Sequence, residues 1–364
     1  MLKFKFLIII FFLFATYIIT ENIYNPKQVK TMYFTVWKDI ALSKHFVLKT
    51  IVQEAKNNNF QISATPPREM LYNPYKSNIF NRNKDINFIA WASFTLPHLS
   101  QKNQSYLWQL ESPISIQIPT PATYKNHFKK IFTYHKPSCD GKQIIYTPIP
   151  YSYNNIKTNI LSLKKTIFIT LVNTYFRGGH YELRIKAIQW FLENYPNDIL
   201  FYGGKWRSLK PNLSKKAQSF FDTQYKGYVQ DKIETISHAK FTLAFENARF
   251  DDYVTEKIFD AMAAGSVPVY SGAPNITNYV PKECFIDYHK FNDFEKLYHF
   301  LKSMNDETYN SYLKCIQNFM TNPKKHENHW ENVSKKILSQ IDLEPSIINW
   351  EQLLQNIKNL SNFK

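Results

Sequence analysis

The feature that most constrains the fold is an alternation of strand-like and helix-like segments in the second half of the chain. Short apolar runs typical of buried strands occur at residues 166–172, 199–202, 241–245 and 267–270. Segments with apolar residues at helical spacing occur between these runs, at about 181–193, 230–238 and 255–264. Strands that alternate with helices form parallel sheets. The second half is therefore predicted to be an α/β domain.

The first half shows a similar, looser alternation. A helical stretch lies at 43–57, and strand-like runs lie at 30–37, 86–91, 106–110 and 131–134. A chain of 364 residues is too long for one ordinary hydrophobic core. Pro, Tyr, Asn and Ser between residues 148 and 165 are typical of an interdomain connection. We predict two Rossmann-like domains, at residues 31–155 and 166–325. A linker at 156–165 joins them, and a helical tail follows at 326–364.

The first 30 residues carry the pattern of a membrane anchor. Residues 6–20 are uncharged and would span about 22 Å as a helix, less than the roughly 30 Å hydrocarbon core of a bilayer. Lys3 and Lys5 favour a cytoplasmic location for residues 1–5. We expect an uncleaved signal-anchor at 6–20, followed by a short stem at 21–30. A cleaved signal peptide is the alternative.

The charge of the chain does not indicate a nucleic-acid partner. The formal net charge is +16, but the lysines are scattered and no basic run exceeds two residues. No DNA- or RNA-binding signature accompanies them, so we expect no nucleic-acid partner. Arginine is rare beside lysine, which makes each arginine a better candidate for a bidentate contact with phosphate or carboxylate.

Several familiar chemical motifs are absent from the sequence. The glycines form neither GxGxxG nor GxxxxGK, and no Asp-x-Asp occurs. We therefore predict no metal site and no requirement for a divalent cation. Cys139, Cys284 and Cys315 lack metal-ligand spacing, although one disulfide is possible.

The loop between the strand at 241–245 and the helix at 255–264 is the best candidate site. Thr255 can cap the helix, and Glu256 in the first turn complements the helix dipole. Lys257 is locally unfavourable at that end unless an anion lies there. A strand end, a polar loop and a helix N-terminus form a common phosphate site in α/β sheets. On the residues alone, a ligand site and a structured turn remain equally open.

The same loop carries a family resemblance. Phe245-Glu246-Asn247, five intervening residues and Tyr253-Val254-Thr255-Glu256-Lys257 closely resemble the donor motif of α1,3-fucosyltransferases, glycosyltransferase family 10. The resemblance is dense from about residue 240 to 291. Upstream, Leu110-Glu111-Ser112-Pro113 is similar to the family's Glu-Ser-Pro segment, and Arg184 matches its donor-phosphate arginine.

The resemblance implies a GT-B fold, with two Rossmann-like domains facing across a cleft, and an inverting transferase that uses GDP-fucose. Glu111 would be the general base toward the acceptor, and Glu256 would face the charge developing on fucose or hold the GDP ribose. The implied donor-binding residues are Arg184, Asn247, Tyr253, Glu256 and Lys257. Glu246 is left open between a donor contact and a buried structural acid.

The resemblance implies O3 of N-acetylglucosamine, in an acceptor oligosaccharide or glycoconjugate, as the hydroxyl that receives fucose. It leaves the acceptor itself unnamed. A transferase for another GDP-sugar and a non-catalytic carbohydrate-binding protein are the alternatives. We expect a single-pass type II protein of the Golgi membrane if the source is eukaryotic. A bacterial membrane-associated protein, or one secreted after signal cleavage, is the alternative location.

Overall fold

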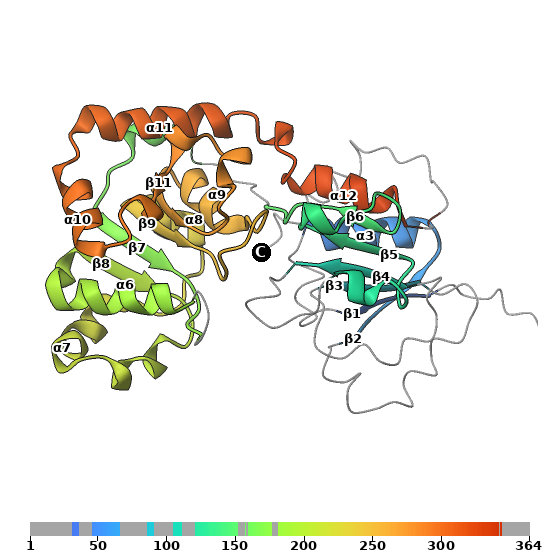
Figure 1. The fold of residues 1–364 in the computed structure, drawn as a ribbon, viewed down its shortest axis with the longest axis horizontal. Helices are drawn as coiled ribbons and strands as arrows, with labels where there is room; N and C mark the ends of the chain where they lie inside the picture. Colours follow the sequence, from blue (N-terminus) through green and yellow to red (C-terminus); the bar gives the residue numbers. More distant parts are fainter. Residues whose placement is uncertain are drawn as a thin grey trace, which may run out of the picture.

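The computed structural model shows two α/β units, each built on a parallel sheet (Figure 1). It describes residues 31–35, 46–65, 86–90, 105–110, 121–151, 157, 159–176, 181–341 and 343. Within these ranges no helix has the length and apolar character needed to cross a membrane. The expected cytoplasmic segment at residues 1–5, the anchor at 6–20 and the stem at 21–30 lie outside the described ranges. The predicted α/β class with parallel sheets is confirmed.

The first unit contains a six-stranded sheet in the order β2-β1-β3-β4-β5-β6. Its strands are β1 (Thr31–Thr35), β2 (Gln61–Thr65), β3 (Ile86–Ala90), β4 (Ser105–Gln109), β5 (Lys130–Thr133) and β6 (Ile144–Tyr146). All five strand pairings are parallel. Helix α3 (Phe46–Asn57) buries Val47, Leu48 and Ile51, which share one face at helical spacing. The chain turns after α3 at Asn59, which adopts the left-handed conformation that Asn tolerates.

The second unit contains a five-stranded sheet in the order β11-β10-β9-β7-β8. Its strands are β7 (Ile167–Val172), β8 (Ile199–Tyr202), β9 (Ala239–Phe245), β10 (Val267–Ser271) and β11 (Ile286–Asp287). The connecting helices are α6 (Tyr181–Asn194), α7 (Lys215–Gln224), α8 (Lys232–Ser237) and α9 (Glu256–Ala263). From β7 the chain first adds β8 on one side and later adds β9 on the other. The carboxyl ends of β7 and β9 therefore form a topological switch point, where open α/β sheets bind ligands.

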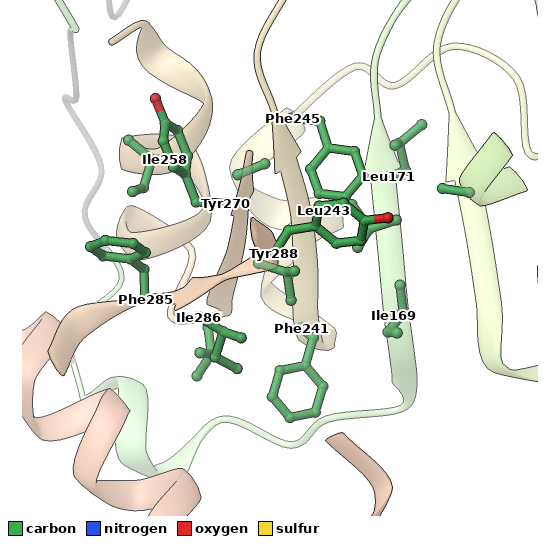
Figure 2. Close-up of a cluster of buried hydrophobic side chains, with 14 of the residues drawn as sticks. Ile169, Leu171, Phe241, Leu243, Phe245, Ile258, Tyr270, Phe285, Ile286 and Tyr288 are labelled. Carbon is green, nitrogen blue, oxygen red and sulfur yellow. The ribbon is translucent and has the colours of Figure 1, made fainter. Parts of the chain in front are cut away.

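The core of the second unit follows from alternation along its strands. Phe241, Leu243 and Phe245 of β9 are all buried and, two residues apart, share one face of the sheet (Figure 2). Tyr288, which follows β11, packs with its ring centroid 5.4 Å from that of Phe245. Helix α9 ends at Ala263 and is followed by Gly265, whose φ of +68° is the left-handed conformation favoured by glycine after a helix.

Three helices follow the second sheet: α10 (Phe294–Ser303), α11 (Asp306–Met320) and α12 (Trp330–Leu338). Helix α12 returns to the first unit and packs on α3, where the rings of Trp330 and Phe46 lie 5.1 Å apart. In the second unit, a disulfide joins Cys284 to Cys315 of α11, while Cys139 is free. Short 3-10 helices are η3 (Pro121–Tyr124), η4 (Lys136–Ser138), η5 (Ile160–Ser162), η6 (Pro196–Asp198), η7 (Trp206–Ser208), η8 (Lys210–Asn212), η9 (Ile276–Asn278), η10 (Lys282–Cys284), η11 (Tyr288–Lys290) and η12 (Pro323–Lys325).

Candidate functional site

The candidate site lies at the carboxyl ends of β7 and β9, where the switch point of the second sheet is located. The first residue after β9 is Glu246, and the loop from there to Thr255 leads into α9. Helix α6, which follows β7, supplies Arg184. The fold therefore brings together Arg184, Glu246, Asn247, Glu256 and Lys257, although more than 60 residues separate the first two.

Glu246 is the buried centre of this site. Its side chain is fully buried, and both carboxylate oxygens accept hydrogen bonds from Thr255. The backbone N–H of Thr255 lies 2.8 Å from Oε1, and its hydroxyl lies 2.7 Å from Oε2. The Nζ of Lys257 lies 3.1 Å from Oε2. The structure thus answers the question left open for Glu246: it is a buried structural acid that organises the start of α9.

The expected capping role of Thr255 is confirmed in position but wrong in its side-chain contact. Thr255 occupies the N-cap position of α9, but its side chain makes no capping hydrogen bond. Its hydroxyl donates to Glu246 and accepts from the ammonium of Lys257 at 2.7 Å. A hydrogen bond to a charged carboxylate is stronger than one between a neutral hydroxyl and a helix N–H group. The hydroxyl of Thr255 therefore turns toward Glu246.

Lys257 lies beside two carboxylates. Its Nζ is 3.1 Å from Glu246 and 3.4 Å from Oε1 of Glu256, and its side chain is only 10% exposed. Burial alone would lower the pKa of Lys257, but the charges of Glu246 and Glu256 outweigh it and raise the pKa. The lysine is therefore held in its charged form. The anion required by a lysine at the start of α9 is supplied by the protein itself, through Glu246.

Glu256 is the most accessible acid of the group, with 46% of its side chain exposed. Burial opposes its ionisation, but the charges of Lys257 and Lys232 prevail and lower its pKa to about 2. Glu256 is thus ionised throughout the physiological pH range. A half-exposed, ionised carboxylate at this position can accept hydrogen bonds from sugar hydroxyls or face a positive charge.

Arg184 is buried rather than placed on the helix surface, with 2% exposure. Its Nε donates to the carbonyl of Phe245 at 3.1 Å, and Nη2 donates to the same carbonyl and to Oδ1 of Asn247 at 2.9 Å. Burial lowers the pKa of Arg184, and nearby Glu246 opposes that change. Within the described part of the chain, Nη1 makes no hydrogen bond. One edge of the guanidinium is therefore fixed, while Nη1 keeps its donors.

The three remaining predicted residues, Asn247, Tyr253 and Glu111, differ in where they lie. Asn247 joins the site through its contact with Arg184. Tyr253 is 1% exposed and belongs to the core of the first unit, where its ring centroid lies 5.2 Å from that of Tyr134. Glu111 lies outside the described residues, directly after the described segment 105–110.

The four charges of the site sum to zero, because Arg184 and Lys257 balance Glu246 and Glu256. Attraction for an anion must therefore come from the placement of the charges. Glu246 is fully buried, whereas the more exposed Glu256 can turn toward solvent. A phosphate group at the start of α9 would meet Lys257 and the positive end of the helix dipole.

Sequence reasoning missed Asp252, which links the loop to the first unit. Its Oδ2 accepts a hydrogen bond from the backbone N–H of Lys136, in η4 of the first unit, at 3.2 Å. Two features of the sequence point weakly to a special role: Asp251 and Asp252 form an acidic pair, and Asp tolerates the left-handed backbone found at residue 252. Neither feature identifies its partner.

Two further features lie apart from these charges. An open groove of about 730 Å³ runs along α6 and is lined in part by Glu182, Lys186, Trp190 and His289, but not by Arg184 or Lys257. Within the described ranges, no group of three or more His, Cys, Asp or Glu side chains could hold a metal ion. Metal-independent activity remains a prediction.

The two α/β units with parallel sheets resemble the GT-B fold of solved structures. The structure resembles a crystal structure of an α1,3-fucosyltransferase with GDP-fucose, with a TM-score of 0.52, 16% identity, and coverage of 87% of this chain and 91% of that one. It also resembles a glycosyltransferase from Rickettsia africae, with a TM-score of 0.53, 10% identity, and coverage of 90% and 100%. At these identities the likeness establishes the fold alone.

Residues 212–347 match the family model for the C-terminal domain of glycosyltransferase family 10 (fucosyltransferase). This match confirms the resemblance found in the loop. The family segment contains Glu246, Asn247, Tyr253, Glu256 and Lys257, but not Arg184 or Glu111.

Relatives agree with this assignment. The 4-galactosyl-N-acetylglucosaminide 3-alpha-L-fucosyltransferase 9 of Mus musculus is 30% identical over 253 residues, which are 66% of this chain and 62% of the relative. The human protein of the same name is 29% identical over the same shares. An alpha-(1,4)-fucosyltransferase of Arabidopsis thaliana is 40% identical over 85 residues, 22% of this chain and 21% of that protein. The matched region thus spans 62% of the length of the mammalian relatives.

Proposed function

We propose that the protein is an inverting α1,3-fucosyltransferase that moves L-fucose from GDP-fucose to O3 of N-acetylglucosamine in an acceptor glycan. In this proposal the two units are the two domains of a GT-B enzyme that face each other across a cleft. The first unit, within residues 31–155, binds the acceptor, and the second, within 166–325, binds GDP-fucose. The names of the mammalian relatives support a galactosylated N-acetylglucosamine as the acceptor.

One observation carries the donor assignment. The charged cluster of Lys257, Glu256 and Glu246 lies at the start of α9, inside the family domain and at the switch point of the sheet. A diphosphate placed there would receive the charge of Lys257, the helix dipole and the remaining donors of Arg184. Asn247 holds Arg184 in place. In this proposal its side chain also contacts an oxygen atom of GDP-fucose. This arrangement suits a leaving group that gains negative charge as it departs.

The reaction needs one proton transfer and one bond exchange. Glu111 would accept the proton from the acceptor hydroxyl, whose oxygen would bond to C1 of fucose. The C1–O bond to the diphosphate would break, and its electron pair would leave with GDP. Arg184 and Lys257 would stabilise the departing diphosphate. Glu256 would face the positive charge that develops on the fucose ring or hold the ribose of GDP.

The proposal is tested by the donor that the protein uses. Purified full-length protein is given GDP-fucose, GDP-mannose or GDP-glucose with an N-acetyllactosamine acceptor, and GDP release and the glycan product are measured. We expect product only with GDP-fucose, and activity that survives EDTA. Equal rates with GDP-mannose would support a transferase for another GDP-sugar. Glycan binding without GDP release would support a carbohydrate-binding protein.

The assignment of the base is tested by Glu111→Gln, which keeps the size of the side chain and removes its basicity. Because this proposal assigns Glu111 to the acceptor side, the affinity for GDP should stay within about twofold. Turnover should fall at least about a hundredfold, the usual contribution of a positioned general base. The decline of the wild-type rate at acid pH should disappear in the variant. A raised acceptor KM with unchanged kcat would instead make Glu111 a binding residue.

We also propose that residues 6–20 hold the protein in a membrane, with the Golgi membrane as the site in a eukaryotic source. The disulfide between Cys284 and Cys315 supports an oxidising compartment for the second unit. Full-length protein should remain in the membrane fraction after a carbonate wash, whereas protein that starts at residue 21 should not. Release of the full-length protein would contradict the anchor.

A further inference from the structure

The loop between β9 and α9 belongs to both units of the molecule. Its ends, at Glu246 and Thr255, are bonded to each other at the donor side. Its middle packs into the core of the first unit, where Phe250 and Tyr253 meet Tyr134 with centroid distances of 6.4 and 5.2 Å. The loop that shapes the charged site is thus also part of the boundary between the units.

Asp252 is a buried acidic residue in the middle of this loop. It is 5% exposed and has a φ of +64°, in the left-handed region. Its Oδ1 accepts from Nδ2 of Asn275 at 2.8 Å and from the hydroxyl of Tyr279 at 2.7 Å, both in the second unit. Its Oδ2 accepts from the backbone N–H of Lys136 at 3.2 Å, in the first unit. One carboxylate therefore uses one oxygen for each unit.

A second contact lies next to this one. The hydroxyl of Tyr279 lies 3.5 Å from that of Tyr146 in the first unit, and Tyr146 donates to Oε1 of Glu327 at 2.8 Å. The ammonium of Lys136 lies 4.7 Å from the ring centroid of Tyr146 and 4.9 Å from that of Tyr279. These contacts lie beside the carboxylate of Asp252 and join the two units at the same place.

We propose that Asp252 is a positioning residue that holds the donor loop in register with the first unit. This inference rests on the proposed function, because it assigns the acceptor to the first unit and the donor to the second. Asp252 does not touch the donor in this scheme. It sets the distance between the acceptor hydroxyl and the fucose, and a misplacement of about 1 Å can cost as much as about a hundredfold in rate.

The substitution Asp252→Asn separates the two oxygens. The new side chain can keep its single oxygen on Asn275 and Tyr279, because these are two donors. Its NH2 group then faces the backbone N–H of Lys136, so the hydrogen bond between the units is replaced by two opposed donors. Asn also tolerates the left-handed backbone. The neighbouring Asp251 is exposed, and Asp251→Asn is the matched control for the loss of one charge in the same loop.

The kinetic test compares acceptor turnover with donor affinity. For Asp252→Asn, kcat/KM for the acceptor should fall at least about tenfold, while the Kd for GDP, measured by calorimetry, stays within about twofold. Asp251→Asn should change neither. An equal loss of GDP affinity would make Asp252 part of the donor site, and an unchanged kcat/KM would overturn the proposal. If Asp252→Asn does not fold, Tyr279→Phe serves instead, with an expected loss of about threefold in kcat/KM at unchanged GDP affinity; no loss would overturn the proposal.

A second measurement does not depend on activity. Hydrogen exchange of the intact protein without substrates reports the protection of the Lys136 amide directly. Asp252→Asn should raise its exchange rate by about tenfold or more, whereas Asp251→Asn should not. Unchanged protection would overturn the link between the units, even if the enzyme is active. If protection is lost as expected but the wild type transfers no fucose, the proposed function fails and the structural link stands.

Discussion

Glu246 follows β9 and Gln109 ends β4, so each lies at the carboxyl edge of a parallel sheet. Both side chains are buried, but their hydrogen bonding differs. Both oxygens of Glu246 are bonded to Thr255, and Lys257 pairs with it. Oε1 of Gln109 accepts from the hydroxyl of Thr133 at 3.1 Å. In the part of the chain that the structure describes, Nε2 of Gln109 and the hydroxyl of Thr147 have no hydrogen-bond partner.

This difference follows from the cost of burial. An unpaired buried carboxylate is far more costly than an unpaired buried amide or hydroxyl. At the carboxyl edge of the second sheet, here called the charged edge, the protein itself must therefore supply the partners of Glu246. At the carboxyl edge of the first sheet, here called the neutral edge for its buried Gln109 and Thr147, unused donors can be carried at a cost of about 1–3 kcal/mol each. The second sheet thus has a preformed charged site, whereas the described edge of the first sheet carries unused hydrogen-bond donors.

The largest expected effect concerns the charged edge. Glu246→Ala removes the acceptor for Thr255 and leaves Lys257 buried without its main partner, so the free energy of unfolding should fall by about 3–5 kcal/mol. Urea unfolding measures this change. The control is Glu256→Ala, which removes a half-exposed acid beside the same lysine and should cost less than about 1 kcal/mol. Equal losses would show that Glu246 is not the centre of the cluster.

The next effect concerns ligand binding at the same edge. If the proposed function holds, Lys257→Ala should weaken GDP and GDP-fucose alike, because both would place a diphosphate at the start of α9. The loss of a charge-assisted contact corresponds to about ten- to a hundredfold in affinity. Calorimetry at a temperature where the variant stays folded measures it, and the exposed Lys282→Ala is the control. If GDP affinity is unchanged, the lysine serves Glu246 alone and the diphosphate lies elsewhere.

Much of the fold could be predicted from the sequence because the buried strands are short apolar runs. The predicted strand at 199–202 coincides with β8, and the predicted helix at 255–264 contains α9. The strand β2 was missed because Gln-Ile-Ser-Ala-Thr is largely polar and pairs only at the edge of its sheet. Helix α7 was missed because its ten residues are mostly polar, so few apolar residues mark its buried face.

From the residues alone, the site was predictable only where its geometry is local; Arg184, more than 60 residues before Glu246, was named only through the family resemblance. Glu256 and Lys257 could be found because a strand end and a helix start are visible in the sequence. The contact of Asp252 with Lys136 could not be predicted, because it joins residues 116 positions apart in two different units. The hydroxyl of Thr255 was misassigned for a related reason: its better acceptor, Glu246, precedes it by nine residues and approaches it only when the loop folds back.

The smallest expected effect concerns the neutral edge and uses two neighbouring threonines. Thr133 and Thr147 are both fully buried, and the N–H of Thr147 donates to the carbonyl of Thr133 at 2.8 Å. Thr133→Val removes a hydroxyl that donates to Gln109, so stability should fall by about 1–3 kcal/mol. Thr147→Val has nearly the same shape and removes a hydroxyl that has no partner among the described residues, so stability should stay equal or rise by up to about 1 kcal/mol. Urea unfolding of both variants measures the difference. Equal destabilisation would show that the Thr147 hydroxyl is bonded in solution, and the contrast between the two edges would then disappear.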